Sequence, residues 1–160
     1  MKVSDVSSKT LLLSLSVILL YDGFIFLQSG YGKITGGKFV EGLAAVLSKF
    51  ASKNPYPWYK SFLEQVAIPN SNLFASLTMW GELLSGLAIV AGGLYLIFIR
   101  NVNKLILSII LLGLGGSIIL NGTFWLAAGW TSPSVDSLNM LMLIIELVTF
   151  VIIFKLFSRR

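Results

Sequence analysis

Four long apolar blocks run through this 160-residue chain, at roughly 10–31, 72–99, 104–130 and 136–157. A helix needs about 20 mostly apolar residues to cross the hydrocarbon core of a bilayer, and each block reaches that length. Charged residues make up 12% of the chain, whereas a soluble domain carries about 25%. The blocks therefore predict an all-α fold, a four-helix transmembrane bundle that forms a single membrane domain over residues 1–160.

The segment 32–71, between the first two blocks, has a different pattern. Residues 38–53 predict an amphipathic interfacial helix, because their apolar residues fall on one helical stripe: Phe39, Val40, Leu43, Leu47 and Phe50. Pro55 and Pro57 end this helix, since the residue before a proline is biased towards extended geometry. Residues 58–67 predict a short second helix.

Basic residues predict the orientation of the chain, because cytoplasmic loops are enriched in Lys and Arg. The short link 130–136 has none of them, and the five lysines of 32–71 count less because that loop is long. We therefore expect a multi-pass protein of the plasma membrane with both termini cytoplasmic and loop 32–71 extracytoplasmic. Nucleic-acid binding is not expected, because no basic patch lies on a soluble domain. The basic residues on the predicted cytoplasmic side are Lys2, Lys9, Arg100, Lys104, Lys155, Arg159 and Arg160.

Each apolar block carries one polar residue at a similar depth: Asp22, Glu82, Asn121 and Glu146. Each lies nine or ten residues, roughly 14 Å, from the same face of the membrane. A charged side chain at the bilayer centre costs at least about 2.5 kcal/mol, so we expect these four to face one another. With no Lys or Arg expected at that depth, the carboxyl groups should be protonated or hydrogen-bonded.

Glu82 and Asp22 are the candidate catalytic residues, and Asn121, Glu146 and Trp80 are candidates for quinone binding. Intramembrane carboxyl groups suit a proton relay or a polar anchor for a quinone head group, because quinone reduction consumes protons. The alternative is a structural hydrogen-bond cluster that holds the bundle together, with the tryptophans acting as interface anchors.

Lys33 and Lys60, in the loop segment, are candidate anion-binding residues, together with backbone N–H groups near Gly36 and Gly37. The alternative is that these lysines are solvated or contact anionic lipid. The chain has no cysteine and no histidine, so it can form neither disulfides nor the cysteine- or histidine-ligated sites of iron–sulfur clusters and haem. We expect no metal site, and a redox role would need an organic carrier or a partner subunit.

Three stretches of the sequence resemble the DoxX/DoxD family of membrane proteins, most closely its DoxD branch: residues 26–33 (FLQSGYGK), 54–59 (NPYPWY) and 80–86 (WGELLSG). The resemblance covers most of the chain and is best over 20–93. It implies a four-helix membrane protein, a subunit of an archaeal thiosulfate:quinone oxidoreductase that oxidises thiosulfate to tetrathionate. It also implies a non-covalently bound quinone as electron acceptor and a small DoxA-like partner subunit.

A second interpretation is a non-catalytic, accessory subunit of a larger respiratory membrane complex, such as a terminal quinol oxidase. The absence of cysteine and histidine is compatible with both interpretations. Fold alone does not decide between them, because one fold supports many functions.

The orientation can be tested with a cysteine at position 134, in the predicted extracytoplasmic link. A membrane-impermeant thiol reagent should label this cysteine from outside intact cells, because the link lacks basic residues. Labelling only after the cytoplasmic face is opened would contradict the predicted orientation.

Overall fold

The computed structural model describes residues 8–99 and 102–159, which are almost entirely helical and contain no strand. The all-α, four-helix prediction is confirmed, because four described helices are long and apolar enough to cross a membrane. Three basic residues used for the orientation, Lys2, Arg100 and Arg160, lie outside the described residues. The elements are α1 (Ser8–Thr35), α2 (Phe39–Ser52), α3 (Pro57–Phe62), the π-helix η2 (Leu63–Ala67), α4 (Ser71–Phe98), α5 (Lys104–Ala128), the 3-10 turn η3 (Gly129–Thr131) and α6 (Pro133–Ser158).

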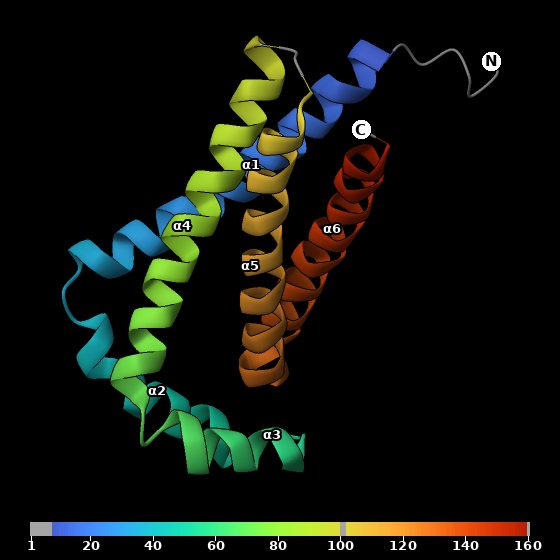
Figure 1. The fold of residues 1–160 in the computed structure, drawn as a ribbon. Helices are drawn as coiled ribbons and strands as arrows, with labels where there is room; N and C mark the ends of the chain where they lie inside the picture. Colours follow the sequence, from blue (N-terminus) through green and yellow to red (C-terminus); the bar gives the residue numbers. More distant parts are fainter. Residues whose placement is uncertain (1–7, 100–101, 160) are drawn as a thin grey trace.

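The long helices form an antiparallel arrangement in which α1 crosses behind α4, while α5 and α6 run side by side (Figure 1). The start of α1 and the end of α6 lie at one end of the bundle, and α2 and α3 lie at the other (Figure 1). Large apolar side chains cover much of the outer surface, such as Leu112 and Phe98. This surface is what a helix bundle presents to lipid rather than to water.

Local sequence signals set where α5 and α6 begin. The side chain of Asn103 accepts a hydrogen bond from the Ile106 N–H at 3.0 Å, and Ser132 accepts one from Val135 at 3.3 Å. Both are N-caps, which satisfy a backbone N–H that has no partner within the helix. Pro133, at the first position of α6, has no N–H to satisfy.

Helices α2 and α3 with η2 form a segment, here called the cap, that lies across one end of the bundle (Figure 1). The chain turns into the cap at Gly37, whose φ of 69° is readily adopted only by glycine. Asn54 fastens the cap to the bundle, because its amide donates to the Leu126 carbonyl at 2.9 Å. The predicted amphipathic helix is therefore present and packs on the bundle.

The helix predicted over 58–67 is present but is not uniformly α-helical. It begins at Pro57 and changes at Leu63 into a π-helix, in which the N–H of Ile68 donates to the Leu63 carbonyl at 2.9 Å. A π-turn contains one more residue than an α-turn. Leu63 and Ala67 are both buried in this turn, so the cap keeps an apolar side towards the bundle.

Glycines allow the backbones of α1 and α4 to approach closely. A Cβ atom at Gly86 would lie 2.5 Å from the backbone nitrogen of Leu27, and one at Gly30 would lie 2.6 Å from that of Leu83. Small residues are the usual means of close helix packing in membranes, where lipid tails remove the hydrophobic drive for association. These contacts fix the pairing of α1 with α4.

Replacing Gly86 with alanine should therefore destabilise the α1–α4 pair by about 1–3 kcal/mol, the usual cost of overpacking a well-packed site. Gly122 is the matched control, because a Cβ there would meet nothing within 4 Å. The measurement is the unfolding midpoint of each variant in detergent. Equal midpoints for Gly86→Ala and Gly122→Ala would contradict the close backbone contact.

Candidate functional site

An ion pair between α1 and α4 is the central polar contact of the bundle. The Lys33 Nζ lies 2.6 Å from Glu82 Oε2 and 2.7 Å from Oε1, and it also donates to Ser29 Oγ at 2.7 Å. Glu82 is buried, whereas the Lys33 side chain is 23% exposed. The expectation that no Lys or Arg reaches the depth of Glu82 is therefore wrong, and this carboxylate has a cationic partner.

The position of Lys33 depends on where α1 ends. The sequence predicted an end near residue 31, but α1 continues to Thr35. Gly30 and Gly32 do not break the helix, and Gly30 instead packs against the backbone of Leu83. Lys33 thus lies one helical turn after Ser29 and faces α4.

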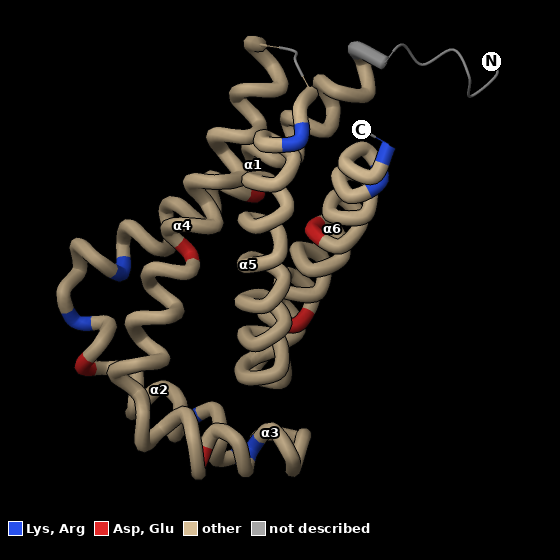
Figure 2. Tube along the Cα trace, in the orientation of Figure 1, with Lys and Arg blue, Asp and Glu red and all other residues tan. Residues whose placement is uncertain are grey.

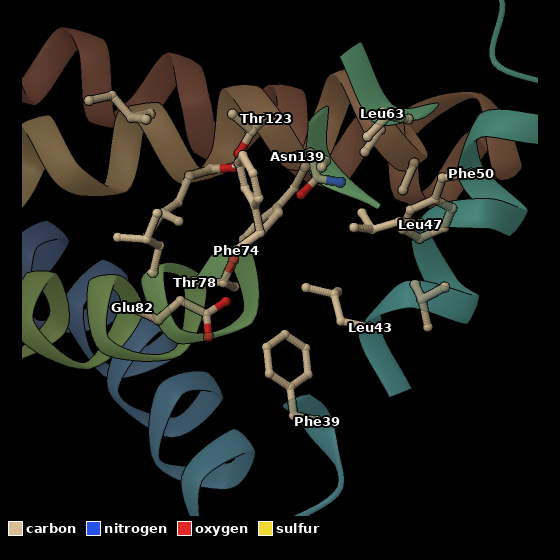
Figure 3. A pocket seen from close by; sticks show the side chains of 18 of the residues that line it. Phe39, Leu43, Leu47, Phe50, Leu63, Phe74, Thr78, Glu82, Thr123 and Asn139 are labelled. Atoms are coloured by element: carbon tan, nitrogen blue, oxygen red, sulfur yellow. Dashed lines mark hydrogen bonds between the residues drawn. The ribbon is translucent and has the colours of Figure 1, made fainter. Parts of the chain in front are cut away.

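A cavity of about 530 Å³ lies beside the ion pair, between the cap and the long helices. Lys33 and Glu82 line it together with residues of α2, α4, α5 and α6. Figure 3 shows the Glu82 carboxyl near the ring of Phe39, with Leu47, Phe50 and Leu63 farther along the cavity. The cavity therefore has a charged, hydrogen-bonding end and a long apolar end.

A few further polar groups line the cavity. Thr78 lies one helical turn before Glu82, and Asn139 projects from α6 (Figure 3). Thr78 and Ser29 could have been found from the sequence, because each precedes a candidate residue by four positions and shares its helix face. Asn139 and the apolar residues of α2 could not, because their position depends on how the cap and α6 pack.

Tyr59 shapes the cavity wall and fastens α3 to α5. Its hydroxyl donates to the Thr123 carbonyl at 3.1 Å, and its ring is buried. Burial raises the pKa of Tyr59 to about 12, because the phenolate would be desolvated. The phenol therefore remains a hydrogen-bond donor at physiological pH.

The other three of the four predicted residues, Asp22, Asn121 and Glu146, form a second group. The Asn121 amide donates to Glu146 Oε1 at 2.6 Å, and the Asp22 carboxyl from α1 neighbours that of Glu146. All three are buried. Lys33, the partner of Glu82, lies 11 residues after Asp22, which is about 16 Å along α1. Among the described residues, no hydrogen bond joins this group to Glu82, so the four predicted residues are buried but divided between two sites.

Trp80 and Lys60 do not line the cavity with Glu82. Trp80 is 50% exposed, because it lies two residues before Glu82 and projects from a different side of α4. The Lys60 ammonium lies 3.9 Å from Glu64 on the exposed side of the cap, and the Lys33 ammonium is bound to Glu82. The structure therefore does not bring the two lysines together as one anion site.

The fold and these sites define a multi-pass, all-α membrane protein with a buried ion pair beside a mostly apolar cavity. Charged residues are concentrated near helix ends and in the cap, with isolated acidic positions inside the bundle (Figure 2). No family model matches the chain, and no curated protein or solved structure matches it either.

Breaking the ion pair should destabilise the fold. Lys33→Met leaves Glu82 buried without its cation, which should cost about 3 kcal/mol, at the low end for a buried pair because Lys33 is 23% exposed. Adding Glu82→Gln should recover most of this loss, since no charge then remains unpaired. Unfolding midpoints of the single and double variants in detergent measure both effects.

Lys60→Met is the control for the ion-pair variants, because the exposed pair of Lys60 with Glu64 should contribute no more than about 1 kcal/mol. If Lys33→Met and Lys60→Met unfold at the same midpoint, Glu82 does not depend on Lys33.

Proposed function

We propose that this chain is the quinone-binding membrane subunit of a thiosulfate:quinone oxidoreductase of the DoxX/DoxD type. The observation that carries the proposal is the cavity of about 530 Å³, which has mostly apolar walls and the Lys33–Glu82 pair at one end. This volume lies within the range of small-molecule sites, about 300–1,000 Å³. A quinone has the matching chemistry, with a polar, redox-active ring and an apolar tail.

In this proposal the quinone ring lies near Phe39 and Thr78, and the tail follows the apolar residues of the cap. The hydroxyl groups of Ser29 and Thr78 supply hydrogen-bond donors for a quinone carbonyl oxygen, whereas the three N–H groups of Lys33 already contact Ser29 and Glu82. A cation at this place stabilises the negative charge that develops on the oxygen as electrons arrive. Glu82 holds the ammonium in position and balances its charge.

Two thiosulfate ions each lose one electron and join through a new S–S bond to form tetrathionate. The quinone takes up these two electrons and two protons and becomes the quinol. Because the chain has no cysteine and no histidine, we assign the thiosulfate oxidation to a surface shared with a DoxA-like partner, with Lys60 as a proposed contact for the anion on the cap.

The motifs behind the family resemblance support this placement. The stretch 26–33 contains Ser29, Gly30 and Lys33, and the stretch 80–86 contains Glu82 and Gly86. These residues form the ion pair and the close contact of α1 with α4. The proposed quinone site therefore includes residues from two of the three stretches that carry the resemblance.

Filling the cavity tests the quinone site. Leu43→Trp places a larger side chain in the cavity wall and should weaken the binding of a short-chain ubiquinone analogue at least tenfold, about 1.4 kcal/mol. Leu112→Trp is the matched control, because Leu112 is 77% exposed on the outer surface of α5. The measurement is calorimetric titration of each variant in detergent, and equal affinities would contradict the site.

Thiosulfate-dependent quinone reduction distinguishes the two functional interpretations. The chain, purified in mild detergent with its co-purifying subunits, should reduce the quinone analogue when thiosulfate is added. Quinone binding without thiosulfate-dependent reduction would instead favour the accessory subunit of a quinol oxidase.

A further inference from the structure

The buried carboxyl groups of Asp22 and Glu146 form a site that the proposed quinone chemistry does not use. Asp22 comes from α1 and is 4% exposed, whereas Glu146 comes from α6 and is 0% exposed. The two carboxyl groups are neighbours. One oxygen of each, Asp22 Oδ2 and Glu146 Oε2, is buried and accepts no hydrogen bond.

Among the residues that the structure describes, no cation interacts with this pair. The groups that interact with Glu146 are Asp22 and, from α5, Ser117 and Asn121. The acidic side chain of α4, Glu82, is bound to Lys33, and the hydroxyl of Tyr95 accepts a hydrogen bond from Asn103 instead. Tyr21 is 68% exposed and lines, with Asp22, a lateral groove between α1 and α6.

Two adjacent carboxylates without a cation would be costly in this position. Each buried charge loses several kcal/mol of solvation, and two like charges at close range repel. A single proton removes the repulsion and one of the two buried charges. It neutralises one carboxyl group and turns that group into a donor for an otherwise unpaired oxygen of the other.

We infer that Asp22 and Glu146 form a proton-binding site in which one proton is shared between the two carboxyl groups. The Asn121 amide donates to Glu146 Oε1 at 2.6 Å and so orients the Glu146 carboxyl towards that of Asp22. Asp22 also lines the lateral groove, a space of about 290 Å³ with otherwise largely apolar walls. The site joins α1 to α6 and is separate from the Lys33–Glu82 pair.

Infrared spectroscopy tests this inference directly, because a protonated carboxyl group has a carbonyl stretching band that a carboxylate lacks. The folded wild-type protein should show this band at neutral pH. The Asp22→Asn/Glu146→Gln variant should lose it, whereas the control Glu64→Gln, which removes an exposed carboxylate on the cap, should keep it.

Two results would overturn the shared proton. One is the absence of the band in folded wild-type protein at neutral pH, which does not depend on whether any variant folds. The other is release of about one proton per chain when sodium ions are added at constant pH, which would make the pair a cation site instead.

Discussion

The close approach of α1 and α4 is the contact on which both the fold and the candidate site depend. Gly30 and Gly86 leave room for the opposing backbone, so side chains that flank them on the two helices come within hydrogen-bonding distance. Lys33 follows Gly30 by three residues, and Glu82 precedes Gly86 by four. A wider spacing between α1 and α4 would leave Glu82 buried without its ammonium partner. The ion pair therefore depends on the small residues that let the two helices approach.

The spans neutralise their buried acidic groups in two different ways. Glu82 has a lysine that reaches in from the cap end of α1. Glu146 has an amide donor and a second carboxyl group as neighbours. Both arrangements keep uncompensated charge out of lipid, but only the first places charge on the wall of a large cavity. This difference is why we assign ligand binding to the first and proton binding to the second.

The sequence was sufficient to predict the four spans, the amphipathic α2 and the burial of Asp22, Glu82, Asn121 and Glu146. It was not sufficient to predict which of these residues meet. Counting residues from one face treats the helices as parallel rods, whereas α1 crosses α4 at an angle (Figure 1). The partner of Glu82 was missed because the apolar block ends near residue 31, whereas α1 continues to Thr35 and places Lys33 against α4.

The π-turn at Leu63–Ala67 makes the length of the cap as important as its composition. Each residue of an α-helix rotates the chain by about 100°, so the additional residue of the turn sets the direction in which the preceding segment faces. Removing one residue there would restore ordinary helical phase and rotate α3 relative to α4. Tyr59 and Phe62 would then turn away from the cavity that they line. Natural variation in this segment should therefore change residue types far more readily than residue number.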